Sequence, residues 1–244
     1  MAVDDRRRHL PGDLRVSTWR GDQRIRVLSP APDRPTPTAA AVVAELRSLR
    51  THGVERVVTS ALHQHEVAPF LESGFVEQER LHLLRHDLAE LPGPGAALTT
   101  RRGWRRDRKA VLELDARAFD DFWTLDARGL DDAIRATPSS RFRVLRFGAH
   151  QLAGYSVTGV SGRRGYLQRL AVDPVHHGRG FGRTLVVDAL RWLQRSGADH
   201  ALVNTQLHNE RALDLYRRSG FVPEPDWLTV LTLRFGDAPT GFGP

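Results

Sequence analysis

The sequence lacks cysteine altogether and has a single methionine among its 244 residues. Without cysteine the protein has no disulfide bond, no thiolate nucleophile and no cysteine-ligated metal. It also lacks an apolar run long enough to span a membrane. The opening residues MAVDDRRRHLPGD lack the apolar segment of a secretory signal. These absences predict a cytoplasmic protein with no membrane partner.

Motifs that bind metals through histidine are missing as well. The sequence has no H-E-x-x-H pattern. His63 and His65 are two positions apart in an expected loop, and His176 and His177 are adjacent. The sequence therefore predicts no metal site.

The basic charge comes almost entirely from arginine. The net charge is +7, yet Lys109 is the only lysine. Replacement of lysine throughout the chain indicates a coding bias rather than a track for phosphates. The stretch RRGWRRDRK at 101–109 places Trp104 among cations, as nucleic-acid sites can. A solvated helix start explains it more simply, so nucleic acid is not an expected partner.

Two proline- and glycine-rich breaks divide the chain. Residues 28–38 (LSPAPDRPTPT) are typical of a loop, and residues 91–98 (LPGPGAAL) of a linker between domains. The sequence therefore predicts a first domain over 1–92, a second over 93–236 and a tail over 237–244.

The second domain has a clear pattern of helices and strands. Apolar periodicity predicts helices over 110–119, 130–136, 182–197 and 209–220. Alternation predicts an antiparallel meander of three strands within 141–173, and further strands over 200–207 and 227–235. These elements predict an α+β layered fold with a mixed, mostly antiparallel sheet flanked by helices.

The first domain repeats part of this pattern. FLESGFVEQERLHLLRHDL at 70–88 matches LYRRSGFVPEPDWLTVLTLRF at 215–235 in its order of helix end, Ser-Gly-Phe-Val, acidic turn and apolar strand. The helix and strand upstream of each segment also correspond. The first domain is therefore interpreted as a partial copy of the second, without the glycine loop described next.

The stretch HHGRGFGR at 176–183 lies between an apolar strand and an amphipathic helix. It matches neither the phosphate-loop nor the dinucleotide-binding pattern. Glycines let consecutive backbone N–H groups turn toward an anion, and the following helix adds its free N-terminal donors. Arg179 and Arg183 add positive charge. The stretch therefore predicts a cradle for a diphosphate.

The segment LAVDPVHHGRGFGRTL, followed by NERALDLYRRSGF, resembles the RimI-like branch of the GNAT N-acetyltransferase superfamily. The family pattern R/Q-x-x-G-x-G/A is present except that His177 replaces the first residue. The resemblance implies the GNAT acyl-CoA N-acyltransferase fold for the second domain. It makes the whole chain similar to a tandem GNAT protein whose N-terminal half is degenerate.

The resemblance implies acetyl-CoA as acyl donor. It places the pyrophosphate on the loop and the first turn of the next helix, and the pantetheine arm along the strand before the loop. The residues that it assigns to the coenzyme are Leu170, Ala171, Val172, His177, Gly178, Arg179, Gly180, Phe181, Gly182, Arg183, Thr184, Asn209 and Tyr216. Asn209 is equally well explained as a helix N-cap.

The resemblance also implies the catalytic groups. Tyr216 takes the place of the tyrosine that protonates the departing thiolate, although it could also be a packed helix residue. The family's base position holds Asn204, which cannot take a proton. Tyr166 is the alternative base, acting through a water held with Gln168, while Asn204 and Gln206 could orient the acceptor. Tyr166 could equally be a cross-strand aromatic.

Acceptor recognition in the family comes from the region that here reads FDDFWTLD. Asp120 and Asp121 could attract a cationic amine, and Phe122 and Trp123 could form the wall of a pocket. The alternative is an acidic turn with two core aromatics. The expected activity is acetyl transfer to an amine of a protein or small molecule. A non-catalytic acyl-CoA sensor is the alternative. The tandem arrangement favours a monomer.

Overall fold

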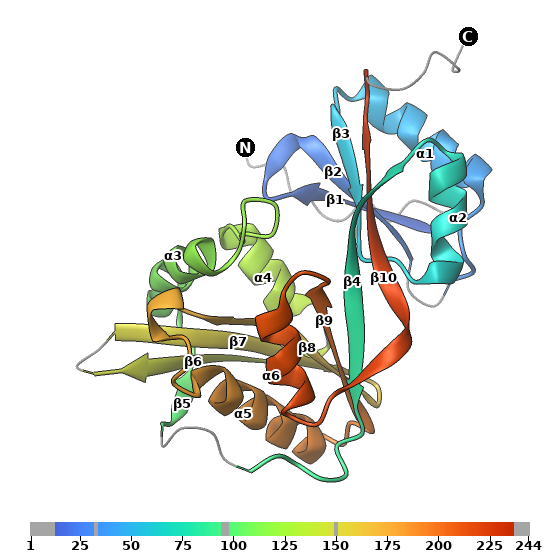
Figure 1. The fold of residues 1–244 in the computed structure, drawn as a ribbon. Coiled ribbons are helices and arrows are strands. Elements are labelled where there is room, and N and C mark those ends of the chain that lie inside the picture. The colour runs from blue at the N-terminus through green and yellow to red at the C-terminus, as the bar shows by residue number, and fades with distance from the viewer. Residues whose placement is uncertain (1–12, 32–33, 94–97, 149–150, 237–244) are drawn as a thin grey trace. The chain divides into compact units, whose positions relative to one another are not determined.

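The computed structural model describes residues 13–31, 34–93, 98–148 and 151–236, which divide into two compact units (Figure 1). Unit 1 takes the described residues of Met1–His82 and Pro225–Pro244, and unit 2 is Leu83–Glu224. This division differs from the one predicted over 1–92 and 93–236, because the last strand belongs to the first unit. The predicted tail lies outside the described residues.

Unit 1 is a sheet with two helices. The strand order in this unit is β1-β2-β3-β10-β4. β2 and β3 are parallel, and β10 pairs antiparallel with β3 from Thr232↔Val58 to Arg234↔Arg56. Its elements are β1 (Leu14–Trp19), β2 (Asp22–Pro30), α1 (Ala39–Thr51), β3 (Arg56–Thr59), α2 (Gln64–Glu72), the first part of β4 (Val76–His86) and most of β10 (Val222–Arg234).

A side-chain cap explains where the first helix of unit 1 begins. The side chain of Thr38 accepts a hydrogen bond from the Ala41 amide and so caps α1 directly after the proline-rich stretch. The cluster of buried side chains in this unit includes Leu28, Val57 and Leu231. The order helix, strand, helix, strand agrees with the copied pattern seen in the sequence; descent from a degenerate GNAT copy stays a prediction.

Unit 2 is built on a second run of strands, in the order β4-β9-β8-β7-β6-β5. β6, β7 and β8 form the predicted antiparallel meander. The elements are β5 (Thr100–Arg102), the short helix η1 (Arg105–Asp107), α3 (Arg108–Ala118), α4 (Ala127–Arg135), β6 (Ser139–Phe147), β7 (Gln151–Ser161), β8 (Arg164–Val172), η2 (Pro174–His176), α5 (Phe181–Arg195), β9 (His200–Gln206) and α6 (Glu210–Arg217).

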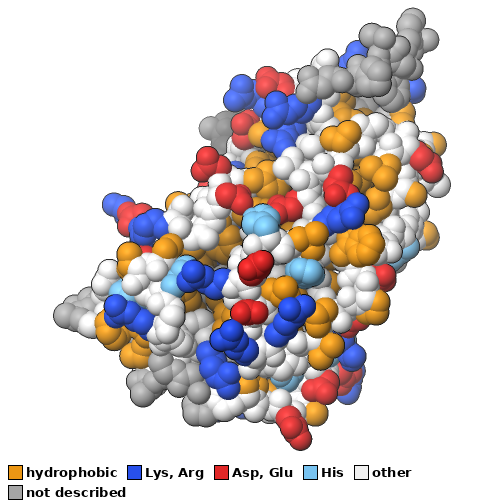
Figure 2. Space-filling model, in the orientation of Figure 1, with side chains coloured by type: hydrophobic (Ala, Val, Ile, Leu, Met, Phe, Trp, Pro, Cys, Tyr) orange, Lys and Arg blue, Asp and Glu red, His pale blue; other side chains and the backbone are white. Residues whose placement is uncertain are grey.

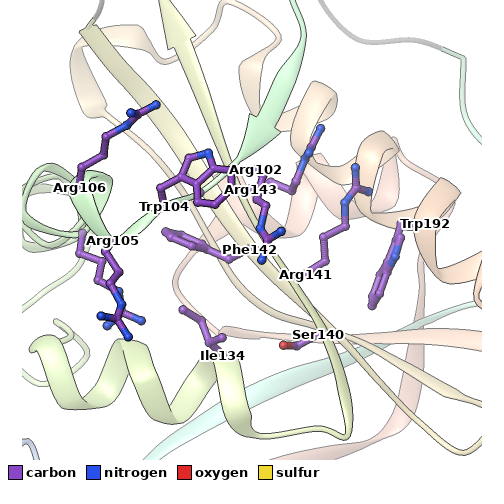
Figure 3. Close-up of a pocket in the computed structure, with 12 residues that line it drawn as sticks. Arg102, Trp104, Arg105, Arg106, Ile134, Ser140, Arg141, Phe142, Arg143 and Trp192 are labelled. Carbon is purple, nitrogen blue, oxygen red and sulfur yellow. The ribbon is translucent and has the colours of Figure 1, made fainter.

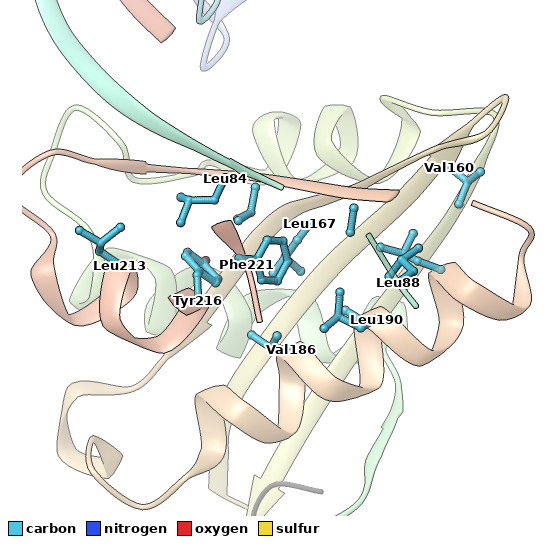
Figure 4. Close-up of a cluster of buried hydrophobic side chains, with 13 residues drawn as sticks. Leu84, Leu88, Val160, Leu167, Val186, Leu190, Leu213, Tyr216 and Phe221 are labelled. Carbon is cyan, nitrogen blue, oxygen red and sulfur yellow. The ribbon is translucent and has the colours of Figure 1, made fainter. Parts of the chain in front are cut away.

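Helices cover both faces of this sheet. Figure 1 shows α5 on one face of β6–β8, and α3 and α4 on the other. The α5 face buries a cluster that includes Leu167, Val186, Leu190 and Tyr216 (Figure 4). The α3 and α4 face buries a separate cluster around Tyr155. This is the α+β fold with a mixed sheet flanked by helices that the sequence predicted.

The structure adds details that the sequence pattern did not give. β5 (Thr100–Arg102) overlaps the beginning of the stretch 101–109, where a solvated helix start was expected. α4 begins at Ala127, before the predicted residue 130, because the Asp126 side chain accepts from the Gly129 amide at 2.6 Å and caps the helix. β10 begins at Val222, ahead of the predicted residue 227.

Among the described residues, no helix is long and apolar enough to cross a membrane.

Because β10 completes the core of unit 1, truncating a buried side chain on this strand should destabilise that unit. Leu231 is fully buried in its core cluster. We expect Leu231→Ala to lower the free energy of unfolding by about 2–5 kcal/mol, measured by urea denaturation of the full chain. Val76→Ala, at an exposed position of β4, serves as the control. Equal effects of the two substitutions would contradict this role of β10.

Candidate active site

The site begins where two parallel strands stop pairing. β8 and β9 pair from Arg164↔His200 to Tyr166↔Leu202. Both strands continue, β8 as far as Val172 and β9 as far as Gln206. Over those ends the described residues show no further pairing between the two. A gap lined by backbone groups therefore opens between the strands.

The direction of the backbone groups in β8 can be derived from its pairing with β7. The amide of Asp173, the residue after β8, donates to the carbonyl of Ala153 at 3.0 Å. The backbone groups of Asp173 therefore face β7. Backbone groups alternate along an antiparallel strand. Those of Ala171 therefore also face β7, whereas those of Leu170 and Val172 face the gap. Of the three predicted strand residues, Leu170 offers its amide and carbonyl to a ligand there. Val172 offers its amide, because its carbonyl already lies 3.1 Å from the Nε2 of His177.

A β-bulge precedes these residues. Thr158 pairs with Leu167 and Val157 with Arg169, which leaves Gln168 as an extra residue. A bulge bends the strand and increases its twist. It also places two consecutive side chains on the same face of the sheet. Gln168 contacts Thr137 next to α4, and Arg169 contacts Asp115 of α3, so both lie on the face that α3 and α4 cover. The bulge therefore helps β8 to diverge from β9.

The three glycines of the loop have two different roles. Gly178 and Gly180 have φ angles of 76° and 79°, in the left-handed region that favours glycine. Gly182 lies inside α5, where a Cβ atom would stand 2.9 Å from the Cδ2 of Leu215. Gly182 therefore permits close packing of α5 against α6, and only the first two shape the loop.

The N-terminus of α5 is open to an anion. Gly180 is the N-cap and has no side chain to satisfy the first amides of the helix. In any helix the first four N–H groups lack an intrahelical acceptor, and the helix dipole is positive at this end. Arg179 and Arg183 flank the turn; the guanidinium of Arg183 donates to the Arg218 carbonyl at 3.1 Å. Thr184, one turn in, donates to the Gly180 carbonyl at 3.2 Å.

Side chains hold the loop to the end of β8. His177 lies 3.1 Å through its Nε2 from the Val172 carbonyl. Asp173 is buried and receives the guanidinium of Arg117 at 2.6 Å. Burial alone would raise the pKa of Asp173, but its hydrogen bonds with Arg117 and the Val175 amide hold that pKa below the usual value. Phe181 is buried against Phe147, with ring centroids 5.4 Å apart. The loop is thus fixed on both sides.

Tyr216 projects from α6 into the α5 side of the sheet and is 5% exposed. Its hydroxyl forms no hydrogen bond with any residue that the structure describes. Burial raises the pKa of Tyr216, against a smaller opposing effect of Arg169. The phenol is therefore protonated at neutral pH and has a proton to donate.

Asn209 caps α6 by accepting from the Ala212 amide at 3.1 Å.

Four predicted polar side chains share the opposite face of the sheet. Val203 and Leu167 face α5, so strand alternation places their neighbours on the α3 and α4 side. These neighbours are Tyr166, Gln168, Asn204 and Gln206. The structure therefore gathers the candidate acceptor residues on one face, and the candidate acid Tyr216 on the other.

The loop after α3 closes over this acceptor face. Gln206 donates its side-chain amide to Asp120 at 3.1 Å, which ties the end of β9 to the loop. Phe122 and Trp123 are half-buried, and their rings meet edge to face with centroids 5.1 Å apart. Asp121 is exposed. The predicted acceptor loop therefore lies beside the predicted polar residues of β9.

A buried charge network that the sequence did not reveal fixes this loop. Asp115 of α3 has no exposed surface and binds Arg169 of β8 in two-pronged fashion, at 2.7 and 2.9 Å. The hydroxyl of Tyr155 and the amide of Leu125 also donate to Asp115. Arg169 further donates to the Trp123 carbonyl at 2.7 Å. The only sequence signal was a polar residue within each apolar segment.

The described residues contain no group of three histidine, aspartate or glutamate side chains placed to hold a metal ion. His63 and His65 stack instead, with ring centroids 5.8 Å apart.

Comparison with known proteins identifies the class of this site. Residues 108–221 match the model described as "Acetyltransferase (GNAT) family". In the solved structures, a tandem GNAT protein from the clavulanic acid biosynthesis pathway aligns with a TM-score of 0.69. That alignment has 17% identity and covers 93% of this chain and 80% of the other. The chain has the GNAT fold, and the match to the family model supports the GNAT acetyltransferase family, whose members use acetyl-CoA as acyl donor.

Two kinds of curated relative match parts of the chain. The N-alpha-acetyltransferase 30 of Saccharomyces cerevisiae is 37% identical over 59 residues, which are 24% of this chain and 34% of the relative. The mycothiol acetyltransferase of Beutenbergia cavernae is 34% identical over 140 residues, which are 54% and 47% of the two proteins. The chain thus spans less than half the length of these two relatives.

Breaking the buried network should destabilise unit 2 strongly. Asp115→Asn removes the charge that faces Arg169, and an uncompensated buried charge costs about 3–5 kcal/mol. The free energy of unfolding, measured by chemical denaturation, tests this. Asp199→Asn is the matched control, because its ion pair with Arg163 is exposed and should contribute little. If Asp115→Asn has the same free energy of unfolding as Asp199→Asn, Asp115 does not fix the loop.

Proposed function

We propose that the chain is an N-acetyltransferase of the RimI-like branch, which transfers the acetyl group of acetyl-CoA directly to an amine of a protein or a small molecule. One observation carries the proposal. The unpaired backbone edge at Leu170 and Val172 leads directly into a glycine loop and the uncapped N-terminus of α5. The strand edge can pair with an extended polar chain such as the pantetheine arm, and the loop and helix N-terminus can bind the diphosphate at its end.

The loop has room for the coenzyme. A Cβ atom added to Gly178 would meet no atom within 4 Å, so the space above the turn is free of protein. The amides from Gly178 to Gly182 would hold the pyrophosphate, together with Arg179, Arg183 and the Thr184 region. The backbone of Leu170 and Val172, with Asn209 opposite, would hold the pantetheine arm. His177 serves as the side chain that fastens the loop, in place of the family's Arg or Gln.

The chain's own groups supply what acetyl transfer needs. Bound acetyl-CoA brings a thioester carbonyl. An amide of the β8 edge near Val172 would donate to that oxygen as negative charge develops on it. Tyr216, whose raised pKa keeps its proton in place, would donate to the departing sulfur. Because the chain has no cysteine, the acetyl group does not pass through a cysteine thioester.

Deprotonation of the amine would use the opposite face of the sheet. Asn204 cannot take a proton, so we assign the relay to Tyr166 and a water held by Gln168. The Oε1 atom of Gln168 is buried and has no hydrogen-bond partner among the described residues. A buried acceptor of this kind is a suitable site for a bound water. Asn204 and Gln206 would orient the amine, while Asp121, Phe122 and Trp123 would contact its substituents.

The relatives suggest the range of acceptors. Their printed names are N-alpha-acetyltransferase and mycothiol acetyltransferase, so both a protein amine and a small-molecule amine belong in an acceptor screen. Release of free thiol from acetyl-CoA with a panel of such amines tests the activity. We further propose that the enzyme acts in the cytoplasm as a monomer, with unit 1 as the degenerate half of a tandem protein.

Asn204 supports a second candidate, a non-catalytic acyl-CoA sensor. A protein that binds coenzyme but lacks the base would give saturable acetyl-CoA binding by calorimetry, and no thiol release with any amine. Thiol release that depends on an amine would exclude the sensor.

A substitution in the loop should remove coenzyme binding. We expect Gly178→Val to place a branched side chain where the phosphates would lie, and to weaken acetyl-CoA binding about 100-fold or more, as loss of several charge-assisted hydrogen bonds predicts. Calorimetry measures this. Gly162→Val is the matched control, because Gly162 also has a positive φ and open space around its Cβ, in a turn outside the loop. Unchanged binding in Gly178→Val would contradict the loop assignment.

Loss of the Tyr216 hydroxyl should slow the reaction without harming the fold. We expect Tyr216→Phe to lower kcat about 100-fold and to leave the KM for acetyl-CoA and the Tm unchanged, because the hydroxyl makes no hydrogen bond to the described protein. The raised pKa of Tyr216 also predicts that the wild type loses no activity through this residue between about pH 7 and 9. A variant with wild-type kcat would exclude Tyr216 as the acid.

A further inference from the structure

A cavity of about 840 Å³ lies in unit 2, at the edge of the sheet (Figure 3). Its walls come from the β5–α3 junction, the first residues of β6, α4 and the α5 residue Trp192. None of the residues that we assign to acetyl-CoA or to the amine lines it. The volume is within the range of sites for small ligands, about 300–1,000 Å³.

Arginine dominates the lining. Among the described residues that line the cavity, none is acidic and six are arginines: Arg102, Arg105, Arg106, Arg108, Arg141 and Arg143. On the molecular face in Figure 2, by contrast, basic and acidic side chains are interspersed. The described lining of the cavity therefore gathers six basic side chains without an acidic one among them.

Three of these six guanidinium groups pair with carboxylates, and the other three have no carboxylate partner among the described residues. Asp131 pairs with Arg108. Asp188 lies 3.1 Å from Arg141 and 3.6 Å from Arg143. The remaining three, Arg102, Arg105 and Arg106, form no ion pair with a residue that the structure describes.

The nearest acidic side chain within the stretch cannot serve them. Asp107 is buried and is committed to Arg101 and Arg146, at 2.6 and 2.9 Å. Its hydrogen bond with Arg101 is the main cause that holds the pKa of Asp107 well below the usual value. Asp107 is therefore not available to neutralise Arg102, Arg105 or Arg106.

Aromatic rings and an open strand edge complete the cavity. Trp104, Phe142 and Trp192 line it, and Trp104 is half-exposed. Pairing of β5 with β6 runs to Arg102↔Arg143, and the Gly103 amide donates once more to the Phe142 carbonyl at 2.9 Å. Beyond that bond, the described chain offers no strand partner to Ser140 on this edge. A ligand in the cavity therefore meets flat apolar surfaces, guanidinium groups and free backbone groups together.

We propose that this cavity binds a nucleoside polyphosphate. Guanidinium groups bind phosphate oxygens in a two-pronged geometry, and nucleobases stack on tryptophan and phenylalanine rings. The phosphates would lie on Arg102, Arg105 and Arg106. The base would stack on Trp192, or on the face of Trp104 that is opposite the Arg102 guanidinium, which lies 4.8 Å from the Trp104 ring centroid. The ligand could be a free nucleotide or the nucleotides of a single strand, since both offer the same phosphate and ring chemistry.

Calorimetric titration of the full chain with ATP, in the presence of excess CoA, tests the proposal. We expect saturable binding that weakens about tenfold or more in the double variant Arg102→Ala/Arg106→Ala, as loss of hydrogen bonds to a charged group predicts. Trp104→Ala should weaken it as well. Arg195→Ala is the matched control, because Arg195 is an exposed arginine of α5 outside the lining and should leave binding unchanged.

A second titration with a short single-stranded oligonucleotide separates the two sources. Tighter and strongly salt-dependent binding of the strand, lost in the double variant, identifies a nucleic-acid strand as the ligand; equal or weaker binding identifies the free nucleotide. The proposal is overturned if neither probe binds, or if binding survives in the double variant. Binding of an acidic peptide at these arginines, with no nucleotide binding, would overturn it too.

Discussion

The end of pairing between β8 and β9 after Tyr166↔Leu202 is the constraint on which the rest of the site depends. A backbone edge that is left unpaired inside a domain needs other hydrogen-bond partners. Leu170 and Val172 present such an edge immediately before a loop of left-handed glycines and an uncapped helix. Strand edge, loop and helix thus offer one continuous series of donors and acceptors, which accounts for both binding and catalysis in the proposed function.

Buried charges keep this arrangement in place. The bulge at Gln168 lets Arg169 reach Asp115 on α3, and Asp173 receives Arg117 from the same helix. Two ion pairs therefore connect α3 to this segment, one at Arg169 within β8 and one at Asp173 directly after it. The same helix leads into the loop that covers the acceptor face. A single helix thus positions the coenzyme edge and the acceptor loop relative to each other.

Local features of the sequence predicted the fold of unit 2 and the place of the loop. Gly178 and Gly180 could be recognised because left-handed turns and helix starts are set by neighbouring residues. The contact between Asp115 and Arg169 joins segments that are far apart in the chain, so no pattern of residue spacing in the sequence could predict it. The assignment of β10 to unit 1 was missed for the same reason, since it depends on pairing with β3. The stretch 101–109 was expected to be a solvated helix start, and its role in a cavity appears only when β6 lies beside it.

Hydrogen–deuterium exchange with and without acetyl-CoA tests the central claim most directly. The account predicts that the coenzyme slows exchange at the amides of Leu170 and Val172 and from Gly178 to Arg183, while the β5–β6 edge is unaffected. Unchanged exchange at these amides under saturating acetyl-CoA, or protection confined to another part of the chain, would contradict it.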